Sequence, residues 1–122
     1  MSYRKTKKVE EKLQNRRAKI LAVGKEVLAE EGYKNVAIKT IAERAGIATG
    51  TFYLYFANKD KLVETIAEEM YRKLLERIRQ ERAKYTATID KLQISMKTCL
   101  DVFSEEKQMA KILLIQAPVK SV

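Results

Sequence analysis

Apolar residues recur along the chain at intervals of three, four and seven, the spacing that places side chains on one face of an α-helix. The first such stripe lies within residues 11–31 and consists of Leu13, Ile20, Leu21, Val27 and Leu28. Gly24 lies on the same stripe, where it permits close packing. Gly32 follows the last apolar position, as expected of a residue that ends a helix. We therefore predict a first helix over residues 11–31.

Two short apolar segments come next and predict a pair of helices joined by a tight turn. In the first segment the inner face consists of Ile38, Ile41, Ala42 and Ala45, and Gly46 ends the helix. Ile47 is placed to fill the space between the two helices. The second segment covers residues 49–56, with Phe52 and Phe56 predicted to be core. This arrangement is a helix-turn-helix, whose second helix enters the major groove of DNA.

Three further helices are predicted beyond residue 57. Asn58 is a good N-cap and Asp60 suits the positive first turn of a long helix that ends near Tyr85. Thr86 and Thr88 offer caps for a fifth helix, predicted to bury Ile89, Leu92, Met96, Cys99, Leu100 and Phe103. A sixth apolar segment covers residues 109–117 and stops at Pro118. Its apolar surface has little sequence left to cover it, so we expect either a second chain there or a longer parent protein.

Composition and charge support an all-α fold with two unequal halves. Four Gly and one Pro in 122 residues are too few for the turns of an all-β fold. The net charge is +9, and residues 1–61 carry 14 Lys and Arg against 7 Asp and Glu, whereas residues 62–122 carry 11 against 9. The basic half suggests nucleic acid as a partner, although basic surfaces also serve solubility. We divide the chain into a basic flexible arm (1–12), a helix-turn-helix domain (13–61) and a partial regulatory domain (62–122).

Several classes of function find no support in the residues. The chain has no His and only one Cys, Cys99, so a disulfide within the chain is impossible and neither a zinc site nor another cofactor is expected. No phosphate-binding loop or clustered carboxylates suggest an enzyme. No apolar run is long enough to span a membrane, and no secretory signal precedes the first helix. We expect a cytoplasmic protein. Residues 1–12 form either a disordered tail or an arm that lies along DNA.

Four blocks in order resemble the TetR (tetracycline repressor) family of transcriptional regulators. The first two are Ala29-Glu-Glu-Gly-Tyr33 and Ile41-Ala-Glu-Arg-Ala-Gly-Ile47. The others are Gly50-Thr-Phe-Tyr-Leu-Tyr-Phe56 and Asn58-Lys-Asp-Lys-Leu62. The resemblance implies a three-helix DNA-binding domain, followed by the first helices of a truncated regulatory domain that binds ligand and dimerises.

The resemblance also implies roles for individual residues. Thr49, Gly50 and Tyr53 match positions that face the major groove, Lys39 and Thr40 match positions beside it, and Tyr55 and Lys59 match phosphate contacts. Ala37 and Ala48 stand where the family often has Ser or Thr as N-caps, so the two short helices are expected to fray or to be capped by Thr40 or Thr49. If Thr49 is a cap, its contact with a base is in question.

The implied mechanism is that of a repressor that binds a palindromic DNA operator as a homodimer and is released by a small-molecule effector. Candidates to line the effector pocket are Met70, Tyr71, Leu74, Met96, Cys99, Phe103 and Ile112, and plain core packing is the alternative for each. These apolar side chains favour a lipophilic or aromatic effector. The alternative for the whole chain is a short helical module that binds a partner protein.

Overall fold

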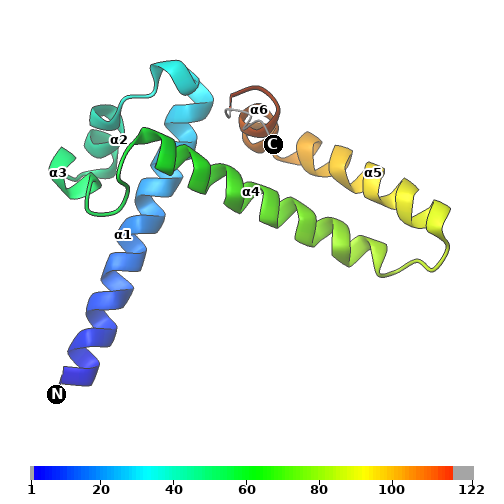
Figure 1. Ribbon diagram of the computed structural model, residues 1–122, viewed down its shortest axis with the longest axis horizontal. Helices are drawn as coiled ribbons and strands as arrows, with labels where there is room; N and C mark the ends of the chain where they lie inside the picture. Colours follow the sequence, from blue (N-terminus) through cyan, green and yellow to red (C-terminus); the bar gives the residue numbers. More distant parts are fainter. Residues whose placement is uncertain (1, 117–122) are drawn as a thin grey trace. The chain divides into compact units, whose positions relative to one another are not determined.

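The computed structural model describes the backbone of residues 2–116 and the side chains of residues 6–114 (Figure 1). All of the described secondary structure is helical, which confirms the all-α prediction. The elements are α1 (Ser2–Glu31), the 3₁₀ turn η1 (Tyr33–Asn35), α2 (Ile38–Ala45), α3 (Thr49–Phe52), α4 (Lys59–Arg82), α5 (Thr88–Glu105), α6 (Lys107–Lys111) and the π-helical turn η2 (Ile112–Gln116). They form two compact units, residues 1–63 and 64–122. This division falls close to the expected boundary between residues 61 and 62.

Helix α1 is much longer than predicted. It begins at Ser2 rather than near Glu11, so the expected flexible arm is helical over residues 2–12. The physical reason is that Lys, Arg and Glu have good intrinsic helix propensity, and no Gly or Pro interrupts this segment. The helix ends at the predicted place, because Gly32 has a φ of 80° that other residues rarely adopt.

In the first unit α2 packs against α1, and α3 packs against α2. Gly46 ends α2 in the left-handed conformation (φ 72°), and its N–H donates to the carbonyl of Glu43. The N–H of Ile47 donates to the carbonyl of Ala42 at 3.0 Å, which closes the turn before α3. Phe52 and Phe56 are buried, as predicted. The other apolar core residues of this unit are Ile20, Leu21, Val27, Leu28, Val36, Ile41, Ala42, Ala45, Leu62 and Val63.

Helix α3 is shorter than the predicted segment of residues 49–56. Only Thr49–Phe52 are helical, and a turn carries the chain on to Phe56. In this turn the N–H groups of Tyr55 and Phe56 both donate to the carbonyl of Phe52. Asn58 then caps α4, as predicted, because its Oδ1 accepts the N–H of Lys61 at 2.9 Å.

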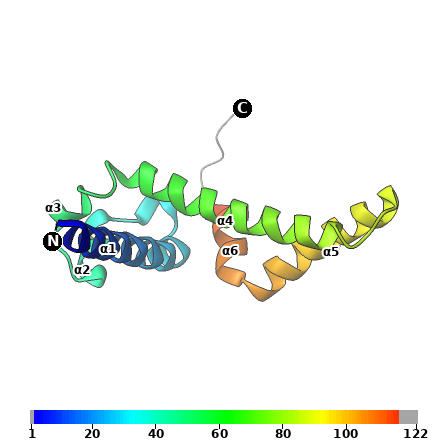
Figure 2. The same ribbon diagram turned by 90° about the horizontal axis from the view of Figure 1, so that it is seen from below.

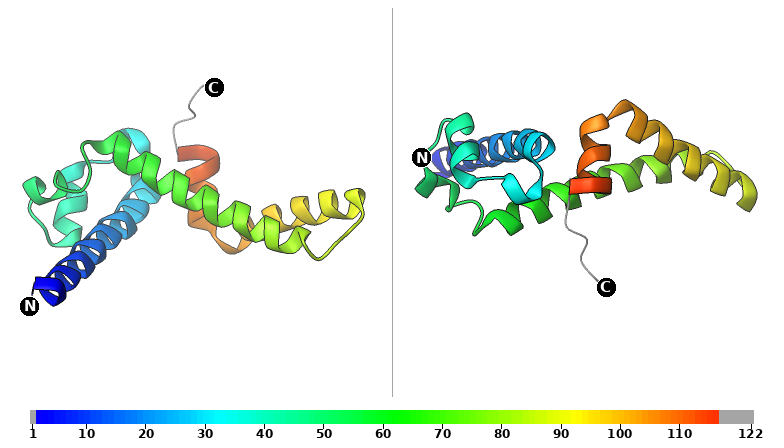
Figure 3. Two further views of the ribbon diagram at one scale, coloured as in Figure 1. Left: turned by 60° about the horizontal axis from the view of Figure 1, so that its bottom comes forward. Right: turned by 90° about the horizontal axis from the view of Figure 1, so that it is seen from above.

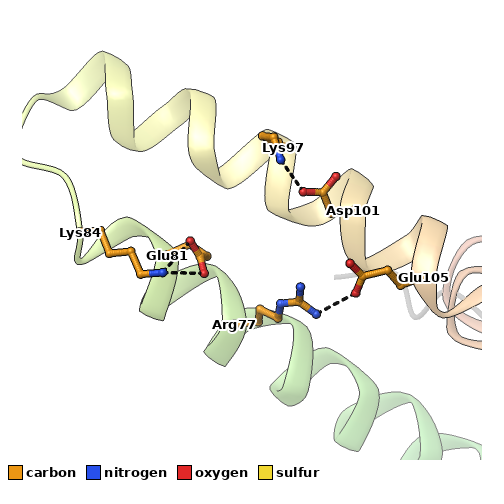
Figure 4. Close-up of polar contacts among 6 residues, drawn as sticks. All are labelled: Arg77, Glu81, Lys84, Lys97, Asp101 and Glu105. Carbon is orange, nitrogen blue, oxygen red and sulfur yellow. Dashed lines mark hydrogen bonds and ion pairs between the residues drawn. The ribbon is translucent and has the colours of Figure 1, made fainter.

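In the second unit α4 and α5 form a helical hairpin, and α6 follows α5 (Figures 2 and 3). Ion pairs join the two arms of the hairpin near the end of α5. Arg77 contacts Glu105 at 3.1 Å (Figure 4), and Lys73 lies 4.0 Å from Glu106. The hydrogen bond from Arg77 to Glu105 raises the pKa of the Arg77 guanidinium above its ordinary value. The predicted apolar segment 109–117 contains η2 and the C-terminal part of α6, and Ala117 and Pro118 lie outside the described residues.

The predicted buried face of α5 was wrong for four of its six residues. The side chains of Ile89, Leu92, Met96 and Leu100 are 56–70% exposed, while Cys99 and Phe103 are half-buried. The buried residues of α5 are instead Thr98 and Val102. The apolar stripe of α5 is wider than its neighbours can cover, and a polar Thr lies on the covered side. The predicted caps were also wrong, because Ala87 precedes α5 and no side chain caps it.

Candidate nucleic-acid interface

The helix-turn-helix presents three of the predicted DNA-contacting residues on its surface. Thr49 and Gly50 are exposed in the first turn of α3, and Tyr53 follows with half of its surface accessible. Phe52 explains this arrangement. Its buried ring anchors α3 to the core, and the ring of Tyr53 packs edge-on against it at 5.6 Å between centroids. The contact with Phe52 therefore holds the Tyr53 side chain in position at the surface.

Gly50 lies beside open space. A Cβ atom added to it would meet no atom within 4 Å, and its backbone is ordinary helix. Packing within this unit does not require a glycine there. Glycine in a helix lowers stability by about 1 kcal/mol relative to alanine. The stability of the fold therefore does not account for a glycine at position 50.

The starts of α2 and α3 lack side-chain caps. Their N-cap residues are Ala37 and Ala48, and no side-chain hydrogen bond caps either helix. Lys39 is exposed and Thr40 half-buried in the first turn of α2. Neither predicted substitute cap is formed, so Thr49 is not used in this way. The first N–H groups of both helices are left for solvent or a ligand.

Tyr55 and Lys59 lie at the junction that leads into α4, and both are half-buried. The ammonium of Lys59 donates to the backbone carbonyl of Tyr33 at 2.9 Å and lies 4.7 Å from the centre of the Tyr33 ring. The hydroxyl of Tyr33 in turn donates to the carboxylate of Asp60. These contacts join η1 to the start of α4 and fix the position of the Lys59 ammonium, which has three N–H donors.

Other cationic residues of this unit are held by internal contacts. Arg44 forms an ion pair with Glu30 at 2.9 Å, which links α2 to α1 and raises the pKa of the Arg44 guanidinium. Arg17 lies over the ring of Phe56, 5.3 Å from its centre. Both residues serve to hold α1 against the helix-turn-helix.

Sequence reasoning missed three residues near this surface. Leu54, directly after Tyr53, is 82% exposed, the largest exposed fraction of any large apolar side chain that the structure describes. Arg16 and Lys19 line a surface pocket of about 410 Å³ together with Ala45–Ala48 and Thr51, beside the turn of the helix-turn-helix. Arg16 and Lys19 could have been found from their spacing of three residues, which places both on one side of a helix. Nothing in the sequence separated Leu54 from a core leucine.

The predicted effector-pocket residues are not all alike. Met70, Leu74 and Ile112 are buried, Cys99 and Phe103 are half-buried, and Tyr71 and Met96 are about half exposed or more. A shallow depression of about 580 Å³ on α4 is lined by polar residues alone: Glu69, Arg72, Lys73, Glu76, Arg77 and Gln80. It involves none of the seven candidates. Among the described residues no cluster of His, Cys, Asp or Glu forms a metal site. In the same part of the chain no helix is long and apolar enough to cross a membrane.

Comparison with known proteins gives a consistent result. Residues 20–66 match the family model of bacterial regulatory proteins of the tetR family. An uncharacterized HTH-type transcriptional regulator of Bacillus subtilis (strain 168), YvdT, is 43% identical over 61 residues, covering 50% of this chain and 31% of that protein. The fatty acid metabolism regulator protein of the same organism is 27% identical over 97 residues, covering 80% of this chain and 50% of that protein.

A solved structure agrees with these sequence matches. The transcriptional regulator FadR from Bacillus subtilis in complex with stearoyl-CoA superposes with a TM-score of 0.73 and 25% identity, covering 86% of this chain and 56% of that one. The chain thus spans from about a third to just over half of the length of these relatives.

Proposed function

We propose that this chain, whose residues 20–66 match the model of the tetR family of bacterial regulatory proteins, is the DNA-binding part of a transcriptional regulator of that family. The observation that carries the proposal is the exposed first turn of α3, held by buried Phe52 within a strongly basic unit. In this proposal two copies place their α3 helices in successive major grooves of a palindromic operator and repress transcription. The family match does not favour the alternative of a module that binds a partner protein.

The roles of individual residues follow from their exposure. Thr49, Gly50 and Tyr53 contact the major groove, and the missing side chain of Gly50 lets the backbone approach the bases closely. Lys39 and Thr40 contact the DNA beside α3. Tyr55 and Lys59 contact phosphates, where the bond of Lys59 to Tyr33 holds its ammonium in place before DNA arrives.

The effector in this proposal is a lipophilic molecule bound by the second unit. Met70, Leu74 and Ile112 supply buried apolar side chains, with Cys99 and Phe103 beside them at intermediate exposure and Tyr71 and Met96 at its exposed margin. The relative from Bacillus subtilis that was solved with stearoyl-CoA supports an acyl chain as the chemical class. Binding of the effector would favour a conformation in which the two α3 helices no longer match the operator. As a regulator of the bacterial type, it would meet its DNA in the cytoplasm.

Selection of bound sequences from fragmented genomic DNA, with salt titrated, tests the proposal. We expect a recovered palindrome and an affinity that falls steeply as salt rises, because phosphate contacts release counterions. Binding without a preferred sequence would reduce the chain to a basic helical domain. No binding at any salt concentration would support the partner-protein alternative.

Two substitutions test the contact surface without disturbing the fold. Gly50→Ala is expected to leave thermal stability unchanged or raise it by up to about 1 kcal/mol, because alanine is the better helix former and its Cβ meets open space. We nevertheless expect it to weaken binding to the recovered operator. Tyr53→Ala should change the sequence preference in a gel-shift titration. An unchanged preference would remove Tyr53 from the readout.

A further inference from the structure

The N-terminal half of α1 extends beyond α2 and α3 (Figures 1 and 3). Every described side chain from Thr6 to Lys19 is exposed, and Ile20 is the first buried one. The core therefore stabilises only the second half of this helix. Isolated helices of about 12 to 15 residues are marginal in water, so the exposed half has to be explained by something other than burial.

One side of the exposed half is basic. Lys8, Lys12, Arg16 and Lys19 follow at intervals of four, four and three residues, which places their side chains on one face. The structure brings all four to one shallow groove of about 360 Å³, with Glu11 and Asn15 as its other lining residues. We call these four cations the α1 basic face. Ile20, the first buried residue of the helix, comes four residues after Arg16 and lines a neighbouring pocket with Arg16 and Lys19.

The α1 basic face continues to the helix-turn-helix. Arg16 and Lys19 line not only this groove but also the pocket formed by Ala45–Ala48 and Thr51, at the turn before α3. Cationic side chains thus run from Lys8 along α1 to the element that is proposed to meet the major groove. Over eleven residues at 1.5 Å each they span about 16 Å, the length of about five base pairs of duplex DNA.

The charges on this face oppose the stability of the free helix. Lys8, Lys12 and Arg16 repel one another at intervals of four residues, and the first turn of α1 has no acidic residue to offset the helix dipole. Across residues 6–114, none of the four cations forms an ion pair, although Arg44, Arg77, Lys84 and Lys97 do. A row of phosphates would remove this repulsion and use all four charges.

We propose that the α1 basic face binds the phosphate backbone of the duplex that flanks the segment contacted by α3. This inference rests on the proposed DNA-binding function and assigns it an additional contact site. The face adds affinity and salt dependence and reads no bases, because it consists of long cationic side chains on a helix outside the groove-reading element.

The test compares two variants of the full chain that lose the same charge. Lys8→Gln/Lys12→Gln removes half of the face, and Lys34→Gln/Lys107→Gln removes two exposed lysines elsewhere. Glutamine keeps good helix propensity in α1, and circular dichroism checks that both variants are folded. The probe is a fluorescent duplex that carries the recovered operator, together with one of unrelated sequence.

The expected result is a smaller salt dependence for the first variant alone. Two lost phosphate contacts reduce the slope of log K against log salt by about 1.8, so that from 50 to 200 mM salt the wild-type chain loses about 12-fold more affinity than this variant. The preference for operator over unrelated DNA stays the same. Equal slopes for both variants, or an altered preference in the first, would overturn the inference. If the wild-type chain binds neither duplex, the proposed function itself is wrong.

Discussion

The two units of this chain differ in how completely they cover their apolar surfaces. In the first unit the apolar stripes of α1, α2 and α4 and the two phenylalanines of the turn region meet in one core, and Phe52, Ile41 and Leu62 are fully buried. In the second unit α5 leaves Ile89, Leu92, Met96 and Leu100 exposed on one side. The helix-turn-helix thus closes its own core and leaves Leu54 exposed, whereas the apolar side of α5 has no cover within the described residues.

The largest expected effect separates the cores of the two units. Phe52→Ala should destabilise the first unit by about 3–5 kcal/mol, because it removes a fully buried ring and leaves a cavity. Leu100→Ala on α5 should change the stability by no more than about 0.5 kcal/mol, because that side chain is 70% exposed. Urea denaturation followed by circular dichroism measures both.

A milder variant and one contrary outcome complete this test. If Phe52→Ala is too unstable to purify, Phe52→Leu offers a milder loss at the same site. A cost for Leu100→Ala as large as that for the phenylalanine would show that the α5 side is covered in solution and that the contrast does not hold there.

An intermediate effect is expected at the helix caps of the first unit. Asn58→Ala should cost about 1 kcal/mol, because it removes the bond from Oδ1 to the Lys61 N–H. The reverse change at an uncapped helix, Ala37→Ser, should stabilise by a similar amount, since Ala37 already has the extended conformation of an N-cap. Thermal unfolding of the two variants measures these changes. An unchanged melting temperature for Asn58→Ala would show that the α4 cap contributes nothing.

The smallest expected effect is that of pH on the free energy of unfolding, for which the two units should behave alike. Arg44 in the first unit and Arg77 and Lys97 in the second have pKa values raised above their ordinary values, each through a hydrogen bond to a carboxylate. A cation with a raised pKa gives its full stabilisation at low pH and loses it only as the pH rises through that raised value. The chain also has no His. Unfolding free energies measured between about pH 6 and pH 8 should therefore be flat, and a titration in this range would contradict the argument.

The exposed N-terminal half of α1 is the part of the first unit that its core does not explain. Burial explains the helix from Ile20 onward, and the four cations of the α1 basic face give the preceding turns a different purpose. Helix propensity predicts that this segment can be helical, but the attraction of a polyanion is what would hold it in that form.

The helical class, the order of the helices and the main buried residues of the first unit could be predicted from the amino-acid sequence. Gly32 and Gly46 mark helix ends because their positive φ angles suit glycine, and Asn58 caps a helix through its own side chain. Phe52 and Phe56 lie four residues apart, and both are buried in the core. These are local rules, and each depends on a few neighbouring residues.

Which apolar faces are covered, and which cations form contacts, depends on how the helices pack together. The stripe on α5 looked like core because periodicity identifies an apolar face but not whether another element packs against it. The same limit applies to charge. The sequence contains Lys59, Arg44 and Lys12 as equivalent cations, yet the first is bound to a carbonyl, the second is paired with a carboxylate and the third faces solvent. Burial and pairing depend on residues far apart in the chain, which no local pattern records.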